Sequence, residues 1–191
     1  MRLHYKGKYD LNPDSLPHGE HQPNAVPFKE AQDTVTLGKY MTIVSIIVLA
    51  VFSVPLFIRC GNFVGSIWFL LGLAASVLAA FPHEFLHAIC FKEDAYIYTN
   101  LKQGMLFVIG PETMSKGRFI FMSLLPNMVF GFLPYTIAMI FPEQTFFASM
   151  GLVSIAAGCG DFYNVFNATT QMPRGARTYL YKFNSFWYMP E

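Results

Sequence analysis

Charged side chains are scarce in this sequence. Lys, Arg, Asp and Glu make up 13% of the 191 residues, whereas soluble domains usually carry about 25%. Hydrophobic residues reach 53% and the mean hydropathy is +0.37, which leaves too few polar side chains to cover a water-soluble globule. The net charge of +1 and the lack of a nucleic-acid-binding motif argue against a nucleic-acid partner. The composition indicates one domain in a membrane.

Cysteine is also scarce, and the beginning of the chain lacks an apolar core of the kind found in signal peptides. The three cysteines, Cys60, Cys90 and Cys159, have no regular spacing, which argues against a disulfide framework. Residues 1–39 are polar and contain several prolines, so we interpret them as a polar cytoplasmic segment. We expect the apolar run that follows to act as an uncleaved signal anchor.

Four long apolar runs dominate the rest of the chain. Each is long enough to suggest a bilayer span, for which about 18 apolar residues are needed. They lie at about residues 40–58, 63–91, 119–141 and 145–170. We therefore expect a transmembrane domain at 40–170 and an aromatic cytoplasmic tail at 171–191.

Basic residues give the orientation of these runs. Four spans place 12 of the 13 Lys and Arg on one side of the expected membrane, and only Arg59 lies on the other side. The positive-inside rule then places both termini and the loop between the second and third runs in the cytoplasm. We expect an integral, multi-pass protein of a cell membrane, and we take that membrane to be bacterial.

The loop between the second and third runs has a strand-like pattern. Residues 95–101 alternate with period two, a short turn follows, and residues 105–109 form a second apolar run. This pattern predicts a β-hairpin, with an irregular loop as the alternative. The expected fold class is an all-α membrane protein: four transmembrane helices with a cytoplasmic β-hairpin between helices 2 and 3.

Four titratable residues interrupt the apolar runs: His83, Glu84, His87 and Asp161. No Lys or Arg lies within the runs to pair with the two carboxylates. Because a charged carboxylate in hydrocarbon costs at least a few kcal/mol, it usually has a partner. A divalent metal ion would balance both carboxylates and use both imidazoles at once.

The spacing of the two histidines supports a metal. His83 and His87 are four residues apart and share one face of a helix, and His-Glu-x-x-His is the zincin signature, in which the glutamate acts on a water molecule. Asp161 is our candidate for the third ligand. It and His83 lie ~15 and ~13 Å from the cytoplasmic ends of their runs, at 1.5 Å per residue. Glu112 and Cys90 remain rival ligands.

Asn127 falls in the same layer of the membrane, ~13 Å past Arg118. Its amide is a candidate catalytic group that holds a substrate backbone or an oxyanion, and a hydrogen bond between helices is the alternative. Pro126 precedes it, removes a backbone N–H and so frees a carbonyl in the preceding turn.

Three short segments carry a family resemblance: PHEFLH at 82–87, LPN at 125–127 and GDFYN at 160–164. They resemble the site-2 proteases and, more closely, a family of membrane zincins with about four spans. The resemblance covers about residues 40–170. It implies a zinc site made by an HExxH helix and an aspartate on a later helix, and membrane-associated β-structure that receives the substrate. The chain departs from site-2 proteases in having Gly160-Asp161-Phe162 where they have Leu-Asp-Gly, and no PDZ-like domain is present.

The first functional hypothesis is an intramembrane zinc metallopeptidase with one zinc ion. His83, His87 and Asp161 would hold the metal, and Glu84 would be the general base. The expected partners are a membrane protein or peptide substrate and the lipid bilayer. The alternative is a membrane scaffold or chaperone-like protein with a structural metal site. The sequence does not decide the substrate, the oligomeric state or the role of the aromatic tail.

Overall fold

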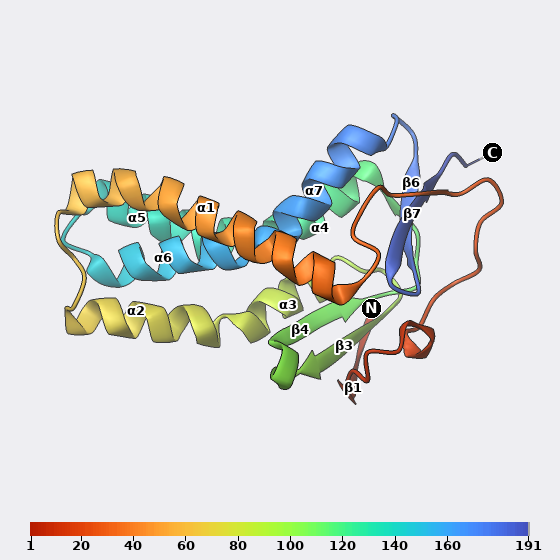
Figure 1. The fold of residues 1–191 in the computed structure, drawn as a ribbon, viewed down its shortest axis with the longest axis horizontal. Helices are drawn as coiled ribbons and strands as arrows, with labels where there is room; N and C mark the ends of the chain where they lie inside the picture. Colours follow the sequence, from red (N-terminus) through yellow and green to blue (C-terminus); the bar gives the residue numbers. More distant parts are fainter. Residues whose placement is uncertain (191) are drawn as a thin grey trace.

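The molecule is elongated, with apolar helices at one end and two small sheets at the other (Figure 1). The computed structural model describes residues 1–190, apart from the side chain of residue 103. Both termini lie at the sheet end. Three helices form the boundary between the two ends: α3 (Ala80–Ala88), α4 (Lys116–Pro126) and α7 (Cys159–Gln171).

The remaining helical elements are those of the apolar end and two short 3-10 turns. They are α1 (Thr34–Cys60), α2 (Ile67–Leu78), the π-helical turn η3 (Asn127–Phe132), α5 (Leu133–Ile140), α6 (Thr145–Ala157), and the 3-10 turns η1 (Pro13–Ser15) and η2 (Leu101–Gln103). The strands are β1 (Arg2–Lys8), β2 (Val26–Pro27), β3 (Asp94–Asn100), β4 (Met105–Ile109), β5 (Met114–Ser115), β6 (Arg177–Tyr181) and β7 (Asn184–Tyr188).

Three helical segments of the described residues are long and apolar enough to cross a membrane: Thr34–Cys60, Ile67–Ala88 and Lys116–Ile140. The fourth predicted span is broken, because α6 and α7 meet at a bend of 49°. Together they make a fourth candidate span only if the bent pair is counted as one. Most apolar side chains of α1 are exposed, and such a continuous apolar surface fits lipid rather than water.

The prediction of an all-α fold is wrong, because the described residues contain seven strands in two sheets. One sheet has the order β1-β3-β4, with β1 parallel to β3 and β3 antiparallel to β4. The β3–β4 pair lies where the alternating pattern predicts a hairpin. The other sheet has the order β2-β7-β6-β5, with its pairs antiparallel.

The additional strands come from the two terminal segments. β1 pairs with β3, about ninety positions further along the chain, and an ion pair of Arg2 with Asp94 at 3.0 Å joins their first residues. No local sequence pattern in residues 1–8 predicts a pairing with a strand so far along the chain. The tail hairpin had a local signal: β6 and β7 are rich in aromatic residues, which favour strands, and they flank a turn at Lys182, whose φ is +56°.

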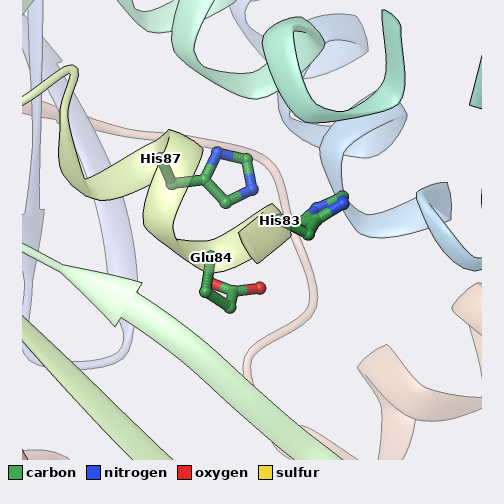
Figure 2. A group of neighbouring side chains, drawn as sticks. All are labelled: His83, Glu84 and His87. Carbon is green, nitrogen blue, oxygen red and sulfur yellow. The ribbon is translucent and has the colours of Figure 1, made fainter. Parts of the chain in front are cut away.

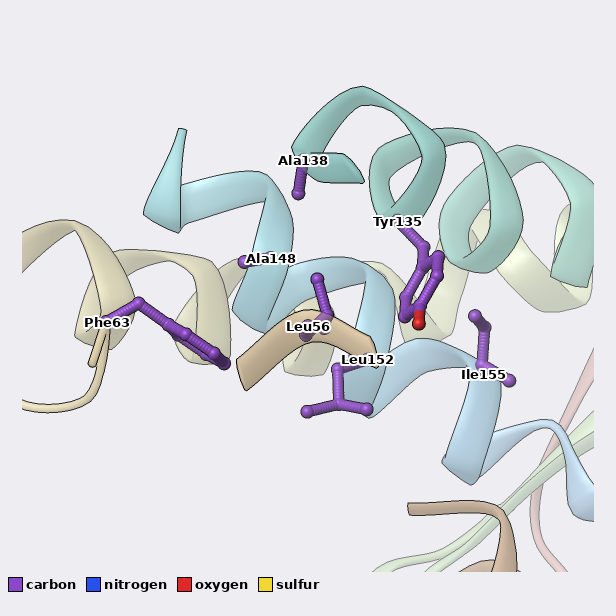
Figure 3. Packing of buried hydrophobic residues seen from close by; sticks show 7 residues of the cluster. All are labelled: Leu56, Phe63, Tyr135, Ala138, Ala148, Leu152 and Ile155. Carbon is purple, nitrogen blue, oxygen red and sulfur yellow. The ribbon is translucent and has the colours of Figure 1, made fainter. Parts of the chain in front are cut away.

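An apolar cluster holds the helices together at the far end (Figure 3). It joins α1, the loop after it, α5 and α6. Its buried members are Leu56, Phe63, Tyr135, Ala138, Ala148, Leu152 and Ile155. The helices that carry this cluster continue toward the sheets, so the cluster fixes the frame within which the polar residues of the boundary helices meet.

Candidate metal centre

The HExxH motif occupies α3, a short helix set off from α2. Pro82 lacks the N–H that would bond to the carbonyl of Leu78, and α2 ends at that residue. His83 and His87 project from one face of α3, with ring centroids 4.9 Å apart, whereas Glu84 points toward β4 (Figure 2). Ligand atoms of these three residues lie within 4.8 Å of one another.

Asp161 reaches both histidines from the first turn of α7. Its Oδ2 lies 3.1 Å from His83 Nε2, and its Oδ1 lies 3.2 Å from His87 Nε2. The three side chains are between 10% and 20% exposed. The break between α6 and α7 places this carboxylate at a helix N-terminus, where the helix dipole favours negative charge. The structure thus brings together all three residues predicted to be metal ligands.

The other ring nitrogen of His87 is fixed by a backbone carbonyl. His87 Nδ1 lies 3.0 Å from the carbonyl oxygen of Met122 in α4. That carbonyl is four residues before Pro126, which has no N–H to bond to it. A carbonyl can only accept, so the Nδ1 of His87 carries the proton and donates. The Nε2 lone pair is then directed at Asp161.

These contacts fit a cation such as zinc. In neutral His87, the Nε2 lone pair faces an oxygen of Asp161, so two acceptors face each other. A proton or a metal ion between them removes that conflict. Two imidazole nitrogens and one carboxylate are ligands that zinc takes in catalytic sites. A metal-ligating histidine typically donates its second N–H to a carbonyl, as His87 does here.

Asn127 belongs to the same cluster and is only 1% exposed. Its Nδ2 donates to Asp161 Oδ2 at 2.7 Å and to the carbonyl of Ser123 at 3.3 Å. Both N–H groups of the amide therefore point into the protein. Asn164, which lies one turn after Asp161, lines the neighbouring cavity. The oxyanion role for Asn127 stays a prediction, and this geometry favours contact with the aspartate.

The rival ligands are engaged elsewhere. Glu112 pairs with Arg118 and accepts from the backbone N–H groups of Lys92 and Glu93 at 2.8 and 2.7 Å. Cys90 Sγ lies 3.4 Å from the carbonyl of Leu86. The potential metal-binding group among the described residues consists of His83, Glu84 and His87, so it contains neither of these rivals nor Asp161. The case for Asp161 rests on its contacts with both histidines.

A hydrogen-bonded clamp holds the end of α3. Arg118 binds the carbonyl of Cys90, with Nε at 2.9 Å, as well as the Glu112 carboxylate. Arg118 was expected only as one of the basic residues and as the reference point for the depth of Asn127. No sequence pattern marked it, because its two partners come from other parts of the chain.

A cavity of about 460 Å³ opens beside the motif. Its floor includes His83, Glu84, His87 and Asp161, and one wall is formed by β4. Residues 178–180 of β6 and the turn after it line another wall, together with Tyr9, Leu16, Glu30 and Ala31 from the N-terminal segment. Both terminal segments thus contribute to the site, which no local pattern in them predicts.

Residues 76–177, more than half of the chain, match a family model described as "Putative zincin peptidase". The matched region includes α3, α4, α7 and the β3–β4 hairpin. No curated protein and no solved structure gives a significant match to the chain.

Proposed function

The chain belongs to this zincin-like peptidase family, and we propose that it is an intramembrane zinc metallopeptidase. Family membership implies a metallopeptidase and zinc. One observation carries the finer proposal: His83 and His87 on α3 and Asp161 on α7 converge at the cavity, and both helices belong to segments that are candidate membrane spans, α7 as half of the bent pair. Polar groups are costly in such surroundings and usually mark a functional site.

The proposed roles follow from where each side chain points. His83 Nε2, His87 Nε2 and the Asp161 carboxylate would hold one zinc ion. Bound zinc supplies a Lewis acid that polarises a peptide carbonyl and acidifies a water molecule. Glu84 has no Lys or Arg partner among the ion pairs of the described residues, so its carboxylate is available to take the water's proton and pass it to the leaving amine.

The cavity suggests how a substrate enters. β4 is an edge strand of its sheet and also a wall of the cavity, and Glu84 points toward it. We propose that a segment of a membrane-embedded or membrane-associated protein, unwound into an extended form, pairs with β4 by strand addition. In that position its backbone would pass over the zinc ligands.

The distribution of basic residues supports a cytoplasmic site. The sheets, the termini and nearly all Lys and Arg lie at the same end of the molecule. Arg59 lies at the opposite end, where its Nε binds the carbonyl of Met139 at 2.9 Å. We propose that the sheets face the cytoplasm, with both termini, in a bacterial cell membrane.

The first experiment measures metal content. Detergent-purified protein, prepared without chelators, should contain one zinc ion per chain, and Asp161→Ala and His87→Ala should each lose most of it. Metal-free wild-type protein would contradict the proposal. Zinc that is lost in His87→Ala but retained in Asp161→Ala would move the third ligand to Glu112 or Cys90.

The second experiment separates a peptidase from a scaffold with a structural metal. The scaffold is favoured by the way in which His83 and His87 tie α3 to α7 through Asp161. A structural site does not need Glu84. The variant Glu84→Gln should retain zinc and lose activity by roughly 10²–10⁴-fold. If cellular function survives Glu84→Gln but not His83→Ala, the scaffold is the better explanation.

A further inference from the structure

The third predicted ligand, Asp161, is held by a residue from a different helix. Asn127 lies at the first position of the π-helical turn η3, and its Nδ2 donates to Asp161 Oδ2 at 2.7 Å. π-Helical turns often occur at functional sites. Of the three metal-ligand candidates, His87 is oriented by the Met122 carbonyl and Asp161 by Asn127. Both of these partners come from the Lys116–Ile140 segment.

The orientation of the Asn127 amide is determined by its surroundings. If oxygen and nitrogen were exchanged, an amide oxygen would face the carboxylate of Asp161, and two acceptors would repel each other. In the orientation present, Oδ1 is buried and has no hydrogen-bond partner among the described residues. Leaving a buried acceptor unsatisfied costs free energy. The amide therefore donates to Asp161 through Nδ2 while its Oδ1 goes without a hydrogen bond.

The space for this amide is provided by Gly158. A Cβ atom added to Gly158 would overlap Asn127 Oδ1 and come 2.5 Å from its Cγ. Gly158 also lies at the bend between α6 and α7. Gly160, two residues later, has nothing within 4 Å of a Cβ added there. Of these two glycines, only Gly158 is required by packing.

We propose that Asn127 is a positioning residue of the metal site and that Gly158 is the socket that admits it. The amide fixes the Asp161 carboxylate against His83 and His87 before metal binds, so that little ordering remains to be done on binding. This inference rests on the proposed function, because it presupposes that Asp161 is a zinc ligand. It assigns to Asn127 a role that acts through Asp161 rather than on the substrate.

The test is a double-mutant cycle with zinc affinity as the readout, measured by competition with a chromophoric chelator on purified protein. Removing a group that orients a metal ligand typically costs 10–100-fold in metal affinity, and we expect this of Asn127→Ala and of Gly158→Ala. The double variant should be no weaker than Asn127→Ala alone, because the three atoms nearest to the new Cβ all belong to the amide that Asn127→Ala removes. Such non-additivity is expected only for residues in contact.

Two further variants separate positioning from packing. Asn127→Leu fills the volume but cannot donate, and should weaken zinc binding as much as Asn127→Ala does. Gly160→Ala introduces the same methyl group beside Asp161 and should leave zinc affinity within about threefold, because space is available there. In the cobalt(II)-substituted protein, the visible absorption bands should shift in Asn127→Ala and stay unchanged in Gly160→Ala.

The outcomes distinguish this inference from the proposed function. If wild-type protein binds zinc and Asn127→Leu binds it with equal affinity, the positioning role of Asn127 is wrong and the proposed function is unaffected. Independent, multiplying effects of Asn127→Ala and Gly158→Ala would overturn the socket. Metal-free wild-type protein would overturn both the inference and the proposed function. If Gly158→Ala alone does not fold and the double variant does, the socket is supported directly.

Discussion

The two ends of the helical part are held together in different ways. At the far end, Gly72 of α2 lies against Ser149 and Phe146 of α6, and Gly151 of α6 lies against the backbone of Tyr135 in α5. At the sheet end, α3, α7 and the first residue of η3 meet through His83, His87, Asp161 and Asn127. The far end is closed by close packing, whereas the sheet end combines charge and hydrogen bonds with apolar clusters, which include Ala88 of α3, Met122 of α4 and Ala168 of α7.

The difference reflects the surroundings of each end. In lipid there is little hydrophobic gain from bringing helices together, so small residues that allow close packing do that work. Ser149 adds one polar contact there, donating to the carbonyl of Phe69 at 2.9 Å. The polar end instead concentrates acceptors around one point, an arrangement that gives little stability without a cation. Stability and function should therefore respond to substitutions in different places.

The largest effect is expected from a substitution in the metal site at the polar end. His87→Ala removes one of three ligands, so zinc affinity should fall by more than about 100-fold and peptidase activity should be lost. The unfolding midpoint of the zinc-free protein should change little. Elemental analysis and unfolding in detergent measure the two quantities. The exposed His18 provides the control, and a comparable loss of zinc in His18→Ala would contradict the assignment.

A substitution that disrupts the packing of the apolar end should lower stability and leave zinc binding unchanged. A Cβ added at Gly151 would overlap backbone atoms of Tyr135, and overpacking of this kind costs about 3 kcal/mol. Gly151→Ala should thus lower the free energy of unfolding by that amount while the folded fraction binds zinc normally. Gly38→Ala, where there is open space, is the matched control. Weakened zinc binding in folded Gly151→Ala protein would show that the two ends are coupled.

Pro126→Ala sharpens the comparison because stability and zinc affinity should move in opposite directions. The new N–H can bond to the carbonyl of Met122 and compete with His87 Nδ1. Zinc affinity should fall by about tenfold or less, while the helix gains a backbone hydrogen bond and becomes more stable.

Pro134→Ala removes a proline from the same segment near the apolar end, and it should leave zinc affinity unchanged. Equal zinc affinities in Pro126→Ala and wild type would mean that the Met122 carbonyl does not orient His87.

The smallest expected effect concerns the wall of the cavity that the N-terminal segment lines. Burial raises the pKa of the Glu30 carboxyl from 4.5, although the backbone N–H of Ser185 and the amide of Asn184 donate to it and lower it in part. A raised pKa in the folded state means that stability is fully present below the unfolded value and falls as pH rises through the folded value.

Glu30→Gln should abolish that decline while keeping an acceptor for Ser185. Thermal unfolding midpoints between about pH 5 and pH 8 should therefore vary less in the variant than in wild type. The exposed Glu20 supplies the control, Glu20→Gln. An unchanged pH profile in Glu30→Gln would mean that this carboxyl does not contribute to the pH dependence.

The local sequence determined the chemistry of this protein and the approximate positions of its helices. Hydropathy located the apolar runs, the spacing of His83 and His87 placed both on one helical face, and depth along the runs put Asp161 and Asn127 in their layer. Pro126 even indicated a free carbonyl, which proves to be that of Met122. These features depend on residues within one or two helical turns of each other, so they can be read along the chain.

The tertiary structure decided everything that depends on distant partners. The parallel pairing of β1 with β3 joins residues about ninety positions apart, and the β6–β7 hairpin becomes a cavity wall only by docking on the rest of the chain. Asp161 accepts from Asn127 of another helical segment, because the π-helical turn and the gap at Gly158 direct that amide inward. Local periodicity reports the face of a helix, whereas the partner of that face is set by packing in three dimensions.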